Sequence, residues 1–458
     1  MSSQSASENR FLTAPPGRLF WSNVLPMMVV MTMSGLQTVI DAAFLGHFVG
    51  ARALAAVSIV FPVLMVTIAL STLVGGGMSS LLARHLGAGD APAAAAVFAG
   101  AHGLAVVLAA GGIALFWIGG ETLTGGLAGG DAEIAGMARS YLAIMIYAMP
   151  VQLALAVHAD AGRNEGRAGL MALMSLGVTL ANIALTALLI VGLGLGVAGS
   201  AWGTALAQAL GLGALLLLRW RHAGALPLAV LWRRSWGGTW AAMLRLGAPL
   251  SLSFLGIALV AATVIATLRL TAGAGYAEIV AAYGLVTRIF SFTFLPLMAI
   301  ALATQSIVGN NIGARRFDRS DRVLRLALAV AFVYCLLVEA GLLAAGARVG
   351  TLFVPDAATA ARVVTVLHPM VALYLFAGPV LVLALYFQAA GRPGRTALLT
   401  LVKPLALGPL LVVGFGTLWG AQAIWYAFPV ADAAVIALAA GILWTGLRRR
   451  ASGVGLGG

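Results

Sequence analysis

Long apolar runs constrain this chain more than any other feature of its sequence. A window of about nineteen residues finds twelve runs, each long enough to cross the hydrocarbon core of a bilayer as a helix. Membrane barrels instead need alternating segments of about ten residues. Since backbone groups in lipid must be satisfied within the segment, the runs predict an all-α integral membrane protein. The predicted spans are 20–44, 54–80, 94–118, 135–159, 170–192, 197–218, 246–270, 279–305, 323–346, 362–388, 396–415 and 421–446.

The composition excludes several other classes of protein. With 61% hydrophobic and 9% charged residues, the chain carries more apolar surface than a water-soluble globule can bury. The net charge is +13, but the basic residues are scattered between apolar runs and do not interleave with aromatics, so we expect no nucleic-acid partner. The single cysteine, Cys335, excludes a disulfide framework and a cysteine metal site.

Basic residues are distributed unequally between the two ends of the predicted spans. Twenty Lys/Arg residues fall on the side of both termini and five on the other, and Arg288 and Lys403 fall inside spans. The positive-inside rule therefore predicts that both termini are cytoplasmic. In a bacterial cell the membrane would be the inner (plasma) membrane. The N-terminal stretch has no cleavage signal after an apolar core and is predicted to be a cytosolic tail.

The second half of the chain repeats the first. The stretch 55–88 recurs at a constant offset of 226 residues as 281–314, with further matches upstream and downstream in the same order. Six spans per copy is an even number, which predicts two parallel, pseudo-symmetric six-helix bundles around a central cleft. The predicted parts are an N-terminal tail (1–19), an N-terminal lobe (20–218), a linker (219–245), a C-terminal lobe (246–446) and a C-terminal tail (447–458).

Asp41 is the leading candidate for ion coupling. An ionisable group inside a span costs about 2.5–3.5 kcal/mol on insertion scales and needs a reason to be there. Asp41 shares a helix face with Gln37 and Ser34, and Pro26 allows the same helix to bend. A carboxyl group that is alternately buried and hydrated suits a protonation switch, although an acid solvated near the membrane edge remains the alternative.

Neutral polar and methionine side chains give further candidates. Asn182 and Thr186 are four residues apart on one predicted helix, and Thr204 and Gln208 repeat this spacing on the next. Such groups more often hold membrane helices together than bind substrate. Methionines could form an adaptable substrate wall or could pack against lipid. The predicted cavity residues are Ser34, Gln37, Met31, Tyr141, Met145, Met174 and Gln208.

The remaining intramembrane charges have weaker patterns. Glu339 and Asp432 have no basic partner at helical contact spacing, and pairing with a neighbouring helix is as good an explanation as coupling. His158 and Asp160 are two residues apart and point to different faces, which makes a poor metal or catalytic pair. We predict no metal site and no catalytic residue.

Several short stretches of the chain match the pattern of one known family in order. They are Asp41-Ala-Ala-Phe-Leu-Gly46 after Pro26, Ala53-Leu-Ala-Ala56, Leu86-Gly-Ala-Gly-Asp90, Asn182-Ile-Ala-Leu with Gly196-Val-Ala-Gly-Ser-Ala201, and Asn310-Asn-Ile-Gly-Ala314. No single stretch is diagnostic, but together they are specific. Over nearly its full length the chain therefore resembles the multidrug and toxic compound extrusion (MATE) transporters.

The resemblance implies an antiporter whose cation site uses a first-helix Asp, an Asn on helix five and a Thr on helix six. Asp41, Asn182 and Thr204 match these positions, and Pro26 matches the helix-bending proline of the DNA-damage-inducible (DinF-like) branch. The chain departs from some members at Thr186, where they carry an acid. It also lacks the acids that other branches carry on helices seven and ten, which favours protons over sodium.

The sequence therefore predicts a secondary active antiporter that exports small amphipathic, often cationic compounds by alternating access. We expect a monomer in the bilayer, with a small-molecule substrate and a coupling cation as partners and no cofactor besides the proton or sodium gradient. One alternative is a flippase for lipid-linked oligosaccharides, whose cationic cavity here would have only Arg288 and Lys403. Another is a membrane-embedded transferase or hydrolase using His158, Asp160 and His368.

Overall fold

The computed structural model describes residues 9–221, 224–353 and 357–450, and the regular secondary structure of these residues is all helical. Within these described residues, ten helices are long and apolar enough to cross a membrane. Two further spans are pairs of helices bent at a break, by 46° after Tyr147 and by 44° after Val371, which brings the number to twelve. The predicted all-α fold is confirmed, and both broken spans had been predicted as single helices.

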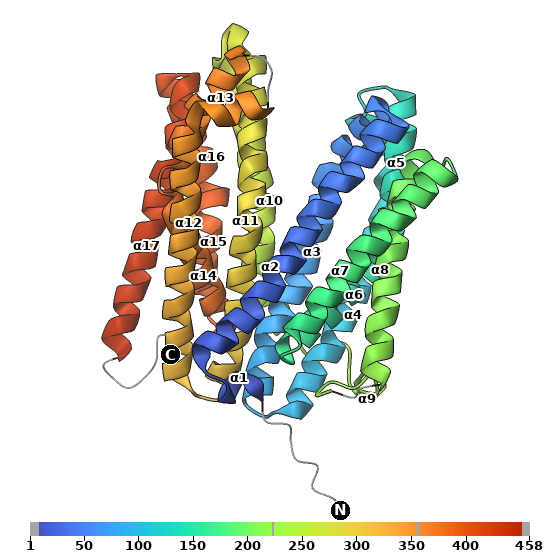
Figure 1. Ribbon diagram of the computed structural model, residues 1–458, viewed down its shortest axis with the longest axis vertical. Coiled ribbons are helices and arrows are strands. Elements are labelled where there is room, and N and C mark those ends of the chain that lie inside the picture. The colour runs from blue at the N-terminus through green and yellow to red at the C-terminus, as the bar shows by residue number, and fades with distance from the viewer. Residues whose placement is uncertain (1–8, 222–223, 354–356, 451–458) are drawn as a thin grey trace, which may run out of the picture. The chain divides into compact units, whose positions relative to one another are not determined.

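The chain divides into two compact units, and Figure 1 shows the helices of each. Of the described residues, the first unit contains 9–14 and 21–251, and the second contains 15–20 and 252–450. The elements up to the linker are α1 (Arg10–Thr13), α2 (Pro16–Phe44), η1 (Leu45–Val49), α3 (Ala51–Gly87), α4 (Ala91–Leu127), α5 (Ala132–Tyr147), α6 (Met149–Asn164), α7 (Ala168–Ala187), η2 (Leu188–Gly192), α8 (Gly196–Arg221) and α9 (Val230–Arg233).

The second half contains α10 (Trp240–Thr271), η3 (Gly273–Gly275), α11 (Tyr276–Gly313), α12 (Phe317–Phe353), α13 (Ala357–Val371), η4 (Tyr374–Phe376), α14 (Ala377–Ala389), α15 (Pro393–Leu401), η5 (Val402–Leu407), α16 (Gly408–Trp419), η6 (Ala421–Tyr426) and α17 (Ala427–Arg450). Of these short elements, η3, η4 and η6 are 3₁₀ turns and η5 is a π-helical turn.

The helix ends reproduce the sequence repeat. Helices α3 and α11 end at Gly87 and Gly313, and α4 and α12 begin at Ala91 and Phe317, in both cases 226 residues apart. The intervening turns also match, since Gly89 (φ 74°) and Arg315 (φ 57°) are both left-handed. The same helical hairpin therefore occurs at equivalent places in the two repeated parts of the chain.

Helix α10 begins inside the first unit, before the predicted lobe boundary. A β-carbon on Gly77 would lie 2.2 Å from the backbone oxygen of Met243, and one on Gly247 would lie 2.1 Å from that of Leu73. Ser251 Oγ also donates a hydrogen bond to the Ala69 carbonyl (2.7 Å). These close contacts between α10 and α3 need glycine, and they explain why the first unit extends through Ser251.

Helices extend into the segments that the sequence predicted as N-terminal tail, linker and C-terminal tail. Asn9 caps α1 by accepting a hydrogen bond from the Phe11 amide (3.0 Å), and Phe11 is buried, so the N-terminal stretch is already folded at residue 9. In the linker α8 continues to Arg221 and α10 starts at Trp240. Helix α17 extends to Arg450, and the rest of the predicted C-terminal tail lies outside the described residues.

Candidate functional site

Asp41 lies near the end of α2 in the first unit, one turn before the π-helical turn η1. Its Oδ1 is buried and has no hydrogen-bond partner among the described residues. The side chain of Gln37 interacts with the carboxyl group, as the shared helix face predicted. Tyr141 on α5 is also within electrostatic range of Asp41. The local site is thus one acid, one amide and one phenol.

The other predicted residues of α2 are more exposed. Ser34 is exposed, and its hydroxyl donates to the Val30 carbonyl of its own helix (3.0 Å). Met31 and Gln37 are half-buried. Pro26 lies inside a helix that runs without a break from Pro16 to Phe44, so α2 is continuous at its proline in this structure.

Asn182 and Thr204 form a hydrogen-bonded pair between α7 and α8, which run side by side (Figure 1). Asn182 Nδ2 donates to Thr204 Oγ1 over 3.0 Å, and Thr204 Oγ1 donates to the Ser200 carbonyl over 3.2 Å. This contact is the helix-joining role that such residues usually have. The two helices nevertheless have hydrogen-bonding groups to spare, because four of their buried oxygens lack a partner in the described part of the chain. These oxygens are Asn182 Oδ1, Thr186 Oγ1, Ser200 Oγ and Gln208 Oε1.

Close packing puts Thr186 against α8. A β-carbon on Gly203 would lie 2.4 Å from Thr186 Oγ1, so glycine at this position allows the hydroxyl to reach the neighbouring backbone. Ile190 and Ala201, at the same end of this helix pair, pack in one apolar cluster with Tyr141 and Leu45. This cluster links the Asp41 end of α2 to the α7–α8 pair. No hydrogen bond between described residues joins Asp41 to Asn182 or Thr204.

The predicted methionine wall is only half-buried. Met145 packs against the cluster that contains Tyr141. Met174 is half-buried on α7, one turn after the buried Met171. The structure assigns neither of them a specific ligand-facing role.

Two histidines that the sequence did not pair lie in contact. His102 on α4 and His158 on α6 have their Nε2 atoms 3.2 Å apart, and both side chains are buried. Phe98 packs edge-on against both rings. The partner of His158 is therefore a histidine 56 residues away in sequence, a pairing that local spacing cannot show.

Asp160 has a different set of partners. It pairs with Arg163 at 2.8 Å, and Arg163 and Asn164 donate hydrogen bonds to Ser79 Oγ on α3 at 3.1 and 2.6 Å. This network fastens α6 to α3. His158 and Asp160 consequently do not form the acid–base pair that the enzyme alternative requires.

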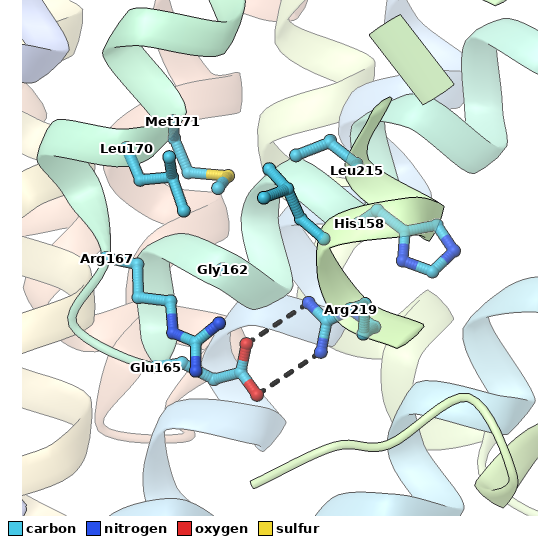
Figure 2. Close-up of a pocket in the computed structure, with 9 residues that line it drawn as sticks. His158, Gly162, Glu165, Arg167, Leu170, Met171, Leu215 and Arg219 are labelled. Atoms are coloured by element: carbon cyan, nitrogen blue, oxygen red, sulfur yellow. Dashed lines mark hydrogen bonds and ion pairs between the residues drawn. The ribbon is translucent and has the colours of Figure 1, made fainter. Parts of the chain in front are cut away.

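A small pocket lies between α6, α7 and α8 (Figure 2). Its most polar feature is an ion pair that the sequence analysis missed, in which Arg219 reaches the two carboxylate oxygens of Glu165 at 3.2 and 3.1 Å. Arg219 also donates to the Leu226 carbonyl (2.9 Å), which ties the linker to α8. None of the seven predicted cavity residues lines this pocket.

The intramembrane acids of the second unit have structural partners. Glu339 Oε2 accepts a hydrogen bond from the Leu375 amide (2.7 Å), at the break of the bent span, where Leu373 is left-handed. Asp432 forms an ion pair with Lys403 of the π-helical turn η5. Of the two explanations offered for Asp432, pairing with a neighbouring helix is the one that the structure shows.

Among the described residues, no group of three or more His, Cys, Asp or Glu side chains could hold a metal ion. His368 lies on α13, next to Pro369.

Comparisons with known proteins agree on one family. The MatE family model matches residues 26–212 and 249–411. A protein named FAD transporter from Shewanella oneidensis is 26% identical over 430 residues, which is 92% of this chain and 93% of the relative. Multidrug export protein MepA from Staphylococcus saprophyticus is 23% identical over 93% of each chain. The structure of a MOP superfamily transporter from Pyrococcus furiosus shares the fold, with a TM-score of 0.87, 23% identity and coverage of 98% of this chain and 99% of that one.

Proposed function

The chain belongs to the MatE family, and we propose that this multi-pass membrane protein exports small amphipathic, often cationic compounds in exchange for protons. The observation that carries the proposal is Asp41, a carboxyl group inside the first span with one buried oxygen that has no hydrogen-bond partner among the described residues. The other two acids deep in the spans, Glu339 and Asp432, already have structural partners. Asp41 is thus left as the acid for coupling.

The proposed cycle uses one change of charge. With a proton bound, Asp41 is neutral and can stay in the apolar surroundings of α2 and α5; without it, the carboxylate needs water or a cation. Proton entry along a potential of about 100 mV supplies about 2.3 kcal/mol per charge. Coupled to rearrangement of the two units, this would drive alternating access. Pro26 is the proposed bending point of α2, because a proline removes one backbone hydrogen bond from the helix.

We place the protein in the bacterial inner membrane with both termini in the cytoplasm, on the strength of the basic residues at that end. The relatives named for multidrug export support drugs and other toxic compounds as substrates. Because the Shewanella oneidensis relative is named FAD transporter, a flavin dinucleotide should also be tested as a substrate.

The proposal is tested by uptake of a fluorescent cationic dye into everted membrane vesicles, whose outer surface is the cytoplasmic face of the membrane. We expect a pH gradient to drive transport and a sodium gradient to have no effect. Asp41→Asn should abolish the response to the pH gradient, while the matched variant Asp131→Asn, outside the spans, should retain it. Transport by Asp41→Asn that still follows the pH gradient would refute proton coupling at this residue. Alanine at His158 and His368 should leave export unchanged. If the protein were an enzyme that used these histidines, the same variants would lose its activity.

A further inference from the structure

Arg288 occupies an unusual position on α11, in the second unit. The buried face of this helix contains Ala282, Tyr283 and Val286, which pack in an apolar cluster with α10, α13 and α16. Arg288 lies on the opposite face and is exposed, as is Phe292 one turn later, at 52%. The arginine therefore points away from the core of its own unit.

Arg288 is also deep within the predicted membrane span. Glu278 and Arg362 form a half-exposed ion pair (3.8 Å) near the start of α11, where the predicted spans 279–305 and 362–388 begin. Arg288 is ten residues further along the helix, about 15 Å at the rise of an α-helix. Because the hydrocarbon core is about 30 Å thick, the guanidinium is near the middle, where an arginine facing lipid costs about 2.5–3.5 kcal/mol or more.

Three other charged groups inside the predicted spans of the second unit have partners among the described residues, and Arg288 has none. Lys403 pairs with Asp432, and Glu339 accepts the Leu375 amide. No described residue forms an ion pair or a hydrogen bond with the Arg288 side chain. A positive charge inside a membrane span that has no partner in the protein needs hydration or an anion.

The repeat shows that the fold does not require this arginine. At the offset of 226 residues the equivalent position on α3 is Pro62, which is exposed in the same way. The first copy thus forms the same helix with an uncharged residue. A requirement of helix packing would apply to both copies, so the charge at Arg288 points to a ligand.

We propose that Arg288 binds the phosphate of an aromatic, amphipathic substrate whose ring stacks on Phe292. The planar guanidinium presents several donors that match phosphate oxygens and is weakly hydrated for a cation. An aromatic ring one helical turn away offers a stacking surface for the remainder of the molecule. This inference rests on the proposed export function and adds a negatively charged class of substrate to it. The same chemistry would recognise either a soluble aromatic phosphate or an anionic lipid headgroup.

The test compares two flavins that differ by one phosphate. Everted vesicles are incubated with riboflavin or with flavin mononucleotide in the medium, and export is measured as uptake into the lumen under a pH gradient that is acidic inside. The wild-type protein should export both. Arg288→Gln should lower export of the mononucleotide by roughly tenfold or more, as expected for loss of a charged hydrogen bond, and leave riboflavin unchanged. Arg288→Lys should retain part of the selectivity, and Arg269→Gln, which removes another exposed arginine, should change neither.

Other outcomes separate this inference from the proposed function. Equal loss of both flavins in Arg288→Gln would assign the residue a structural role and overturn the inference. Export of riboflavin and the cationic dye without the mononucleotide, and without Arg288-dependent flipping of an anionic phospholipid, would also overturn it, while the export function would stand. Failure to export all three would overturn the export function itself. Flipping of a fluorescent anionic phospholipid in proteoliposomes that depends on Arg288, without mononucleotide export, would identify the phosphate as a lipid headgroup.

Discussion

Asn182 Nδ2 donates a buried hydrogen bond of 3.0 Å to Thr204 Oγ1, and the oxygen of the same amide has no partner among the residues that the structure describes. One half of the Asn182 side chain thus joins two helices, and the other half keeps an acceptor free. This arrangement explains how a residue that holds α7 to α8 could also serve a proton- or cation-linked site.

The Asn182–Thr204 contact should contribute modestly to stability. Hydrogen bonds between membrane helices average about 0.6 kcal/mol and reach about 1.7. We expect a double-mutant cycle of Asn182→Ala and Thr204→Val, measured by reversible unfolding in detergent, to give a coupling energy in this range. A coupling energy near zero would mean that the hydrogen bond is absent in the folded protein. If Asn182 also serves coupling, Asn182→Ala should lose more transport than Thr204→Val at equal stability.

Glu339 should be required for its oxygen and not for its charge. The Leu375 amide at the broken span would be left unsatisfied in Glu339→Ala, at a cost of about 1–3 kcal/mol, while Glu339→Gln retains an acceptor. The expected order of melting temperature in detergent is wild type, then Glu339→Gln, then Glu339→Ala. Both variants that fold should still export under a pH gradient, because coupling is assigned to Asp41. Loss of coupling in a stable Glu339→Gln variant would contradict that assignment.

The effect of replacing Lys403 on stability should depend on whether Asp432 is present, and the reverse should hold as well. Removing one partner leaves an uncompensated charge in a half-buried site, which we expect to destabilise the protein by about 1–3 kcal/mol after allowance for partial exposure. The double variant Lys403→Met, Asp432→Asn should be more stable than either single variant. A double variant as unstable as the sum of the two singles would show that the pair is not formed.

The protein should be more stable with glycine at position 315 than with the native arginine. Arg315 has φ 57° at the position equivalent to Gly89, whose φ is 74°. A left-handed non-glycine residue costs about 1–2 kcal/mol, and the greater freedom of glycine in the unfolded chain offsets about 0.5–1 kcal/mol of this. Arg315→Gly should therefore increase the free energy of unfolding by up to about 1 kcal/mol. Arg315→Ala, which keeps a β-carbon, should give no gain, and Gly89→Ala should destabilise the first copy.

Asp131 should make the turn before α5 sensitive to acid. Its carboxylate accepts hydrogen bonds from the Ile134 and Glu133 amides (both 3.1 Å) and from Arg52, and these contacts lower the pKa of Asp131 below 3.8, the amide of Ile134 most of all. Since the folded-state pKa is lowered, the stabilisation is present above the unfolded-state pKa and is lost as the pH falls through the folded-state value.

Thermal melting of the wild type and Asp131→Asn at a series of pH values checks this prediction. The wild type should melt at the higher temperature near neutral pH, and the difference should shrink below about pH 4. A difference that does not change between pH 6 and pH 3 would show that the charge of Asp131 has no part in the stability of the turn.

The helices, the repeat and the leading acid could be predicted from the sequence. Apolar runs and the alternation of basic loops are properties of the chain itself, because lipid dictates a helical backbone wherever twenty apolar residues occur together. The offset of 226 residues carried through to helix ends at Gly87 and Gly313. Asp41 and Gln37 share a face because they are one turn apart on one helix.

Only the tertiary structure decided which polar groups meet. His102 contacts His158, which is 56 residues away in sequence. Glu165 pairs with Arg219 at a separation of 54 residues, and Lys403 pairs with Asp432 at a separation of 29. Such contacts depend on the rotation and depth of separately formed helices, which local periodicity does not encode. For the same reason, the sequence could only identify Arg288 and Lys403 as cations inside predicted spans. The packing of the helices showed that Lys403 has a carboxylate partner and that Arg288 faces away from the core of its unit.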